Sequence, residues 1–198
     1  MKTYTKKRIT QEPRLEIVYD SGCFSPREDT NLGYFITVDK DYHSPDKNII
    51  LEELITYTGD VADDVDDHMK AIKREVKEQT GETVIAIYSI VKYEHSGINY
   101  SLGTKHGFDY SNNGFYIVTD KTQKETGVKK KDFKKCIEAE LDIYNKYVNG
   151  ETYAFTLYDE KGEIEDNCNN FYSIEDIQDY LPKEWKNEKL MEYFNDNY

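Results

Sequence analysis

Two histidines, a serine and an aspartate lie close together in residues 93–119, and they are the side chains of this chain best suited to chemistry. Asp109 follows three residues after His106, and Ser96 follows directly after His95. A carboxylate that orients an imidazole makes the imidazole a general base. As one alternative, the segment therefore predicts a small hydrolase or nuclease-like enzyme that uses His95, His106 and Asp109.

The same residues also allow a metal site or a purely structural interpretation. Metal binding would need two or three of His43, His95, His106 and Asp109 to converge in space. A serine next to a histidine is poorly placed to form a triad with it, because neighbouring strand residues point to opposite faces. In the structural interpretation residues 95–97 form a turn whose side chains bond the local backbone. We expect no bound metal and no cofactor.

Other catalytic signatures are absent from the sequence. It contains no Gly-x-x-x-x-Gly-Lys-Ser/Thr phosphate loop, no Gly-x-Gly-x-x-Gly motif, no His-Glu-x-x-His motif and no Gly-x-Ser-x-Gly motif. Three consecutive lysines at 129–131 could bind phosphate, but short runs of charge are usually solvated surface. The sequence therefore favours a binding protein over an enzyme.

Charge is the strongest compositional signal. The formal net charge is −13, and this sign repels the phosphates of DNA and RNA, so direct nucleic-acid binding is disfavoured. An acidic surface can instead occupy a protein groove built for nucleic acid. The acids concentrate in two blocks, one on each side of the lysine-rich residues 121–135. The expected partner-binding residues are Asp60, Asp63, Asp64, Asp66, Asp67, Glu163, Glu165 and Asp166.

The rest of the composition predicts a folded protein in a reducing compartment. The chain has 198 residues with 18 Tyr and 8 Phe, whereas a disordered acidic chain is poor in aromatic residues. Cys23, Cys136 and Cys168 lack a Cys-x-x-Cys spacing, so neither a disulfide framework nor a zinc site is indicated. No signal peptide or membrane-spanning run is recognisable. We expect a cytoplasmic protein without a membrane partner.

Hydrophobic periodicity predicts both strands and helices. The predicted strands cover residues 15–19, 34–38, 83–91, 114–118 and 153–158, with a hairpin partner at 162–165. The predicted helices cover residues 61–79, 131–148, 173–180 and 182–194, with a short helix that Thr119 caps and that ends near Gly127.

These elements predict an α+β fold. About five strands, mostly connected as hairpins, would form a mainly antiparallel sheet covered by helices, and the C-terminus would be helical. No linker composition is visible, so we expect a single domain over residues 1–198. Residues 173–198 would then be a C-terminal helical appendage.

Several short motifs, each occurring once, lie along residues 14–172. They are Ser25-Pro26-Arg27-Glu28, Asn31-Leu32-Gly33, His95-Ser96-Gly97-Ile98, Asp109 and the strand from Gly114 to Thr119, followed by Tyr144, Tyr147, Gly150, Tyr153, Cys168 and Phe171-Tyr172. In their order they resemble a family of uncharacterised proteins from bacteriophages and other mobile elements of low-GC Gram-positive bacteria. The resemblance implies a phage-type setting in a bacterial host, and it implies no particular activity.

Together these observations predict a phage or mobile-element protein that inhibits a host nucleic-acid-handling defence protein. The partner would be a CRISPR effector or a restriction system with a basic nucleic-acid groove. Acidic side chains would dock onto its Lys and Arg residues, and Tyr rings would supply buried anchors. The alternatives are the enzyme described above and a phage accessory protein with no role in defence. The sequence predicts no oligomeric state.

Overall fold

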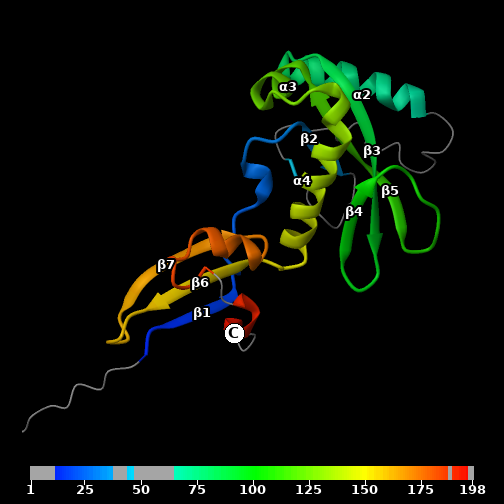
Figure 1. Ribbon diagram of the computed structural model, residues 1–198. Coiled ribbons are helices and arrows are strands. Elements are labelled where there is room, and N and C mark those ends of the chain that lie inside the picture. The colour runs from blue at the N-terminus through cyan, green and yellow to red at the C-terminus, as the bar shows by residue number, and fades with distance from the viewer. Residues whose placement is uncertain (1–11, 38–43, 47–64, 187–188, 196–198) are drawn as a thin grey trace, which may run out of the picture. The chain divides into compact units, whose positions relative to one another are not determined.

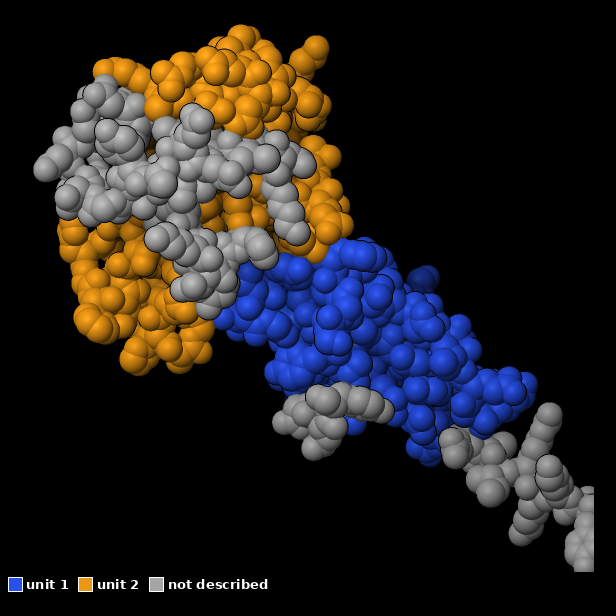
Figure 2. Space-filling view, turned by 180° about the vertical axis from the view of Figure 1, so that it is seen from behind, with its two compact units in different colours: residues 1–24, 146–198 blue, residues 25–145 orange. Residues whose placement is uncertain are grey.

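The computed structural model describes residues 12–37, 44–46, 65–186 and 189–195, which belong to two compact units (Figures 1 and 2). Unit 1 combines residues 1–24 with residues 146–198, and unit 2 is the continuous stretch 25–145. Each unit contains its own antiparallel sheet. The prediction of an α+β class is confirmed, although the strands are divided between two sheets. The single domain over residues 1–198 stays a prediction.

The described residues of unit 2 form a four-stranded sheet in the order β2-β5-β3-β4. Its strands are β2 (Tyr34–Thr37), β3 (Val84–Glu94), β4 (Ile98–Leu102) and β5 (Tyr110–Thr119). The apolar run predicted as a central strand is β3, which pairs with β4 on one side and β5 on the other. Strand β4 was not predicted, because its sequence Ile-Asn-Tyr-Ser-Leu carries only a short apolar pattern.

Apolar side chains on both faces of this sheet pack against helices. In the described part of the chain the α-helices are α2 (Val65–Thr80), α3 (Asp120–Thr126) and α4 (Phe133–Val148), whose last turn belongs to unit 1. Ile117 of β5 packs with Ile72 and Val76 of α2. On the opposite face, the ring of Phe35 contacts the edge of the Tyr144 ring of α4 at a centroid distance of 5.4 Å. The sheet therefore lies between α2 and α4, as alternation along its strands requires.

The helix boundaries follow local capping chemistry. Thr119 forms a capping box with Thr122, and Gly127 ends α3 in the left-handed conformation with φ +68°. Both features confirm the predicted short helix. Helix α4 begins at Phe133, after a 3₁₀ turn over residues 130–132. The predicted beginning of the first helix, at residue 61, lies outside the described residues.

Unit 1 contains a three-stranded sheet in the order β1-β6-β7. Its strands are β1 (Arg14–Tyr19), β6 (Tyr153–Tyr158) and β7 (Ile164–Phe171). One face is apolar, because Ile17, Phe155 and Leu157 are nearly completely buried there. In unit 1 the chain thus pairs a strand near residue 15 with a hairpin beyond residue 150.

The C-terminal segment covers the apolar face of this sheet. Ile174, Ile177, Leu181 and Leu190 lie in the same core as the strand residues, and Trp185 packs against it. Where the structure describes this segment, its helical parts are two short 3₁₀ turns, η3 (Glu175–Asp179) and η4 (Leu190–Tyr193). The helices expected over 173–180 and 182–194 are therefore shorter here, and a proline after Leu181 prevents η3 from continuing.

Gly33 lies directly before β2, where β5 leaves no space for a side chain. A Cβ atom at Gly33 would overlap the carbonyl oxygen of Ile117 and would lie 2.8 Å from the ring of Tyr116. We expect Gly33→Ala to lower the free energy of unfolding by about 2 kcal/mol or more, because the two strands must separate. Urea denaturation followed by circular dichroism measures the change.

The matched control is Gly22→Ala in unit 1. The nearest atom to a Cβ there is the Oδ1 of Asp20 at 3.5 Å, an ordinary contact, so we expect a change within about 0.5 kcal/mol. Equal effects of the two substitutions would contradict the close approach of β2 and β5 at Gly33.

Candidate functional site

The loop with the Ser-Pro-Arg-Glu motif folds around the side chain of Arg27, which is only 3% exposed. Ser25 caps the 3₁₀ helix η1 (Pro26–Glu28) by accepting a hydrogen bond from the Arg27 amide. Asn31 Oδ1 accepts from the Arg27 guanidinium at 2.9 Å, and its Nδ2 donates to the carbonyl of Asp29 at 2.7 Å. The two motifs of the loop therefore hold one arginine in place.

Two carboxylates flank the guanidinium of Arg27. Its Nη2 lies 2.7 Å from Asp46 Oδ2, and its Nη1 lies 2.9 Å from Glu140 Oε2. Nη2 also donates to the carbonyl of Gly33 at 2.6 Å. Burial is the largest influence on the pKa of Arg27 and lowers it, but the charge and hydrogen bond of Asp46, together with Tyr116 and Glu140, outweigh burial and hold that pKa above its ordinary value. The arginine therefore stays charged and bridges the loop, Asp46 and α4.

Glu140 also accepts hydrogen bonds from groups other than Arg27. The Tyr116 hydroxyl donates to Glu140 Oε2, and the Leu32 amide donates to Oε1 at 2.8 Å. Cys136 lies one turn earlier on α4, with its Sγ 3.6 Å from Oε1. Burial, followed by the Glu140 charge, raises the pKa of Cys136 to about 11. The thiol is therefore protonated at neutral pH and is not an activated nucleophile. The cluster is suited to holding the fold together.

A second buried carboxylate, Glu82, joins β2 to the beginning of α3. The Tyr34 hydroxyl lies 3.0 Å from both Glu82 oxygens, and Thr119 Oγ1 donates to Oε2 at 2.7 Å. Lys121 Nζ lies 3.2 Å from Oε1. Burial, followed by the hydrogen bond to Glu82, raises the pKa of Tyr34 to about 12. This network therefore depends on a protonated phenol.

The residues predicted for catalysis lie on the turns at one end of the unit 2 sheet. His95 follows β3, and its Nδ1 lies 3.8 Å from Asp109 Oδ2, which is longer than a hydrogen bond. The His95 side chain is 68% exposed, and His106 is also exposed in the connection from β4 to β5. The structure therefore brings His95 and Asp109 near each other on an open surface, where little excludes water.

Backbone hydrogen bonds organise these turns. Asn112 Oδ1 accepts from the Lys105 amide at 2.9 Å, and its Nδ2 donates to the Lys105 carbonyl at 2.8 Å. The Glu94 amide donates to the Asp109 carbonyl at 3.0 Å. In the part of the chain that the structure describes, no three His, Cys, Asp or Glu side chains are placed to hold a metal ion. His43 lies outside that part.

The predicted acidic residues fall into two groups. Asp60, Asp63 and Asp64 lie outside the described residues, and Asp66 and Asp67 belong to the beginning of α2. The second group, Glu163, Glu165 and Asp166, is exposed on the β6–β7 hairpin of unit 1.

The carboxylates of this hairpin are open to a partner. Asp159 is used by the turn itself, since its Oδ1 accepts from the amides of Lys161 at 2.7 Å and Glu163 at 2.9 Å. Among the described residues, the carboxylates of Glu163, Glu165 and Asp166 form no hydrogen bond or ion pair. We name these three residues the acidic hairpin.

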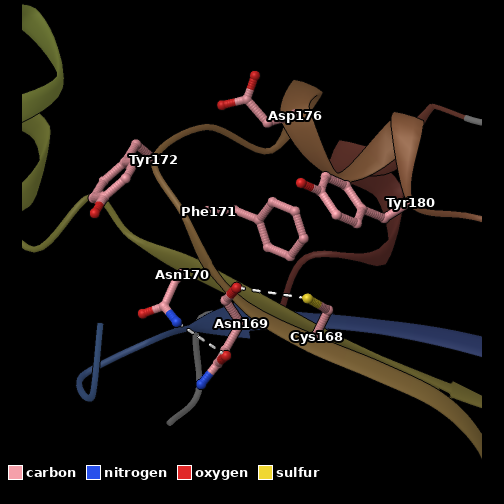
Figure 3. A pocket seen from close by; sticks show the side chains of 7 residues that line it. All are labelled: Cys168, Asn169, Asn170, Phe171, Tyr172, Asp176 and Tyr180. Carbon is pink, nitrogen blue, oxygen red and sulfur yellow. Dashed lines mark hydrogen bonds between the residues drawn. The ribbon is translucent and has the colours of Figure 1, made fainter. Parts of the chain in front are cut away.

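A small pocket lies beside the same strand (Figure 3). Its volume is about 350 Å³. Its lining residues come from the end of β7 and from the turn over η3: Cys168, Asn169, Asn170, Phe171, Tyr172, Asp176 and Tyr180. Cys168 and Phe171-Tyr172 belong to the short motifs of the sequence, but no periodicity indicates that they share a cavity with Asp176 and Tyr180.

Comparison with known proteins gives no relative for this chain: no protein-family model, curated protein or solved structure matches it. The helices within the described ranges include none with the length and apolarity that crossing a membrane requires. The functional inference therefore depends on the structure of the chain itself. It is an α+β chain with a buried arginine cluster in unit 2 and an exposed acidic hairpin in unit 1.

Arg27→Met tests the buried cluster. The substitution leaves Asp46 and Glu140 without their shared cation, so we expect the free energy of unfolding to fall by about 3–5 kcal/mol. Urea denaturation measures it. Arg14→Met is the control, because Arg14 is 51% exposed in its ion pair with Glu16 and should change stability by less than about 1 kcal/mol. A similar loss in both variants would contradict a special role of Arg27.

The phenol of Tyr34 predicts a loss of stability at alkaline pH. Its pKa is about 12 in the folded chain, against about 10 in an unfolded chain. The contribution of the protonated phenol is therefore complete below pH 10 and is lost as the pH rises towards 12. Unfolding free energies at pH 9, 10 and 11 should fall less steeply for Tyr34→Phe than for the unsubstituted protein. Parallel pH profiles would contradict this role of Tyr34.

Proposed function

We propose that this chain is a phage or mobile-element protein that binds and inhibits a host nucleic-acid-handling defence protein. The partner carries a basic nucleic-acid groove, as CRISPR effectors and restriction systems do. The observation that carries the proposal is the acidic hairpin, whose three exposed carboxylates lack ion-pair partners among the described residues. Exposed, unpaired charge of one sign attracts a surface of the opposite sign.

The spacing of these carboxylates suits a site made for nucleic acid. Glu163 lies directly before β7 and Glu165 lies within it, and two residues of extended chain span at most about 6.6–7.2 Å. Successive phosphates on a nucleic-acid strand lie roughly 7 Å apart, given their axial repeat and the radius of the backbone. Lys and Arg side chains that bind successive phosphates could therefore reach successive carboxylates of the acidic hairpin. Because these pairs are exposed, salt weakens them.

Binding is favoured over catalysis by the surroundings of the candidate catalytic residues. His95 and Asp109 are 3.8 Å apart, with side chains 68% and 36% exposed. Catalytic groups are usually held within hydrogen-bonding distance in a site that excludes water. The acidic hairpin needs no enclosure, because long-range attraction acts before contact.

A pull-down with the full chain from a bacterial host lysate tests the proposal at about 50 mM and 500 mM salt. We expect a basic nucleic-acid-binding protein to be retained at low salt and mostly released at high salt. The triple variant Glu163→Gln, Glu165→Gln, Asp166→Asn should retain at least tenfold less of it, because each lost charge weakens the encounter.

The matched control removes the same charge from unit 2. Glu78, Glu125 and Glu138 are exposed on α2, α3 and α4, and their replacement by Gln should leave retention within about twofold. The purified partner then allows a direct assay, in which the chain should block the partner's binding to DNA or RNA. Equal retention by both triple variants, or an unimpaired partner, would contradict the proposal.

A further inference from the structure

Strand β7 has an open edge. Among the described strands it is the last of the unit 1 sheet, and its strand partner there is β6. Within the described ranges no backbone–backbone hydrogen bond joins residues 164–171 to a segment other than β6, and among their amides that of Asn170 donates to a side chain, Asp20 Oδ2, at 3.0 Å. The opposite edge is different, because the Asn195 amide donates to the Ile17 carbonyl of β1 at 2.8 Å. An open strand edge is a template for a further strand from another chain.

The register of β7 places its side chains on two faces. Asp166 pairs with Leu157 and Cys168 pairs with Phe155, so both lie on the face of the sheet that is apolar in β6. Phe171 reaches the same face after an irregularity in pairing and is 4% exposed. An added strand would therefore run past Asp166 towards the pocket beside Phe171. The pocket thus lies where one side chain of that strand would point.

The end of β7 is fixed in place. Asn170 has a left-handed backbone with φ +66°, which is uncommon for a residue other than glycine. Its Oδ1 accepts from the Phe24 amide at 2.9 Å, and its own amide donates to Asp20 Oδ2 at 3.0 Å. The Tyr172 hydroxyl donates to the Phe24 carbonyl at 3.0 Å. The wall of the pocket is therefore held before any ligand arrives.

Aromatic rings and a carboxylate give the pocket its chemistry. Phe171 and Tyr180 meet edge to face, with ring centroids 5.0 Å apart, and Tyr180 is 62% exposed. In Figure 3, Phe171 lies between Tyr172 and Tyr180, and Asp176 extends from the turn above them. The Asp176 amide donates to Ser173 Oγ, while its carboxylate has no partner among the described residues. Rings beside a free carboxylate suit a guanidinium, which stacks and pairs at once.

The negative charges along β7 and at the pocket determine which kind of strand can bind to its open edge. The exposed carboxylates of Glu165 and Asp166 lie along β7, and Asp176 lies at the pocket. In a strand contributed by a second copy of this chain, like charges would lie close together, which is destabilising. A segment with alternating Lys or Arg residues would instead find opposite charges.

We propose that β7 binds an extended basic segment of the partner as an added strand, with one arginine side chain in the pocket of Phe171, Asp176 and Tyr180. The inference rests on the proposed function, in that the acidic hairpin is taken as a docking surface. It goes further by naming the conformation of the bound segment and the side chain that anchors it.

The probe is the fluorescein-labelled peptide Lys-Val-Lys-Val-Arg-Val-Lys-Val-Lys with blocked ends, titrated with the full chain by fluorescence anisotropy. A second peptide has the same sequence with five successive N-methylated central residues, which preserves charge but prevents strand pairing. A third has lysine in place of arginine. We expect binding at least tenfold weaker for the N-methylated peptide and about threefold to tenfold weaker for the lysine peptide.

Variants of the protein distinguish binding of the arginine in the pocket from non-specific attraction between charges. Asp176→Asn with Tyr180→Ala should bind the arginine peptide at least tenfold more weakly, since aromatic and charged anchors dominate such sites. The control, Glu192→Gln with Met191→Ala, makes the same change of charge and also removes an exposed apolar side chain, Met191 being 62% exposed. It should bind within twofold of the unsubstituted chain. Circular dichroism checks that both variants are folded.

Hydrogen exchange locates the bound peptide. The amides of residues 164–169 that point away from β6 should exchange at least tenfold more slowly with the arginine peptide present, and those of β1 should not change. Equal binding of the N-methylated peptide, unchanged exchange in β7, or no binding by 1 mM peptide would overturn the inference. If the pull-down still depends on the acidic hairpin in that case, the proposed function stands without strand addition. If that dependence is also absent, both fail.

Discussion

The guanidinium of Arg27 holds together three parts of unit 2 that are distant in sequence: the loop before β2, Asp46 and α4. A buried cation must be paired, because an unpaired charge in a protein interior is strongly destabilising. Glu140 supplies part of that pairing and also accepts bonds from the Leu32 amide and the Tyr116 hydroxyl. The position of the sheet against α4 therefore depends on one ion cluster as well as on apolar packing.

The two units use their charged groups differently. In unit 2 the buried carboxylate of Glu82 and the half-buried carboxylate of Glu140 are bonded to hydroxyl, amide and cationic donors of the same unit. In unit 1 the acidic hairpin has no such partners among the described residues. Satisfied buried charge fixes a fold, whereas exposed unsatisfied charge is available to another molecule. Exposed acids also occur on the helices of unit 2, but in unit 1 three of them lie within residues 163–166, and the proposed function is assigned to unit 1 for that reason.

Local patterns predicted much of the fold and little of the site. The hydrophobic periodicity that predicts α4 and the residues that cap and end α3 each lie within a short stretch of sequence, and the structure confirms both helices. The sequence showed the Ser-Pro-Arg-Glu motif but not the ion pairs of Arg27, because its partner Glu140 lies 113 residues further along the chain. The pocket beside Phe171 is formed by the end of a strand and a 3₁₀ turn, and hydrophobic periodicity in the sequence does not predict that these two segments lie together. The short C-terminal turns are stabilised by burial in a shared core rather than by a strong helical pattern.

The path of the chain through the two sheets has a consequence for biosynthesis. Residues 25–145 form a continuous unit, and β2 to β5 of its sheet are synthesised before β6. Strand β1 pairs with β6, from Arg14 with Tyr158 to Tyr19 with Tyr153, so it must wait for that strand while the inserted unit folds first. Closing so long a loop is entropically costly in an unfolded chain. A folded insert brings β1 and the later hairpin closer, and it therefore acts as an internal scaffold for cotranslational folding.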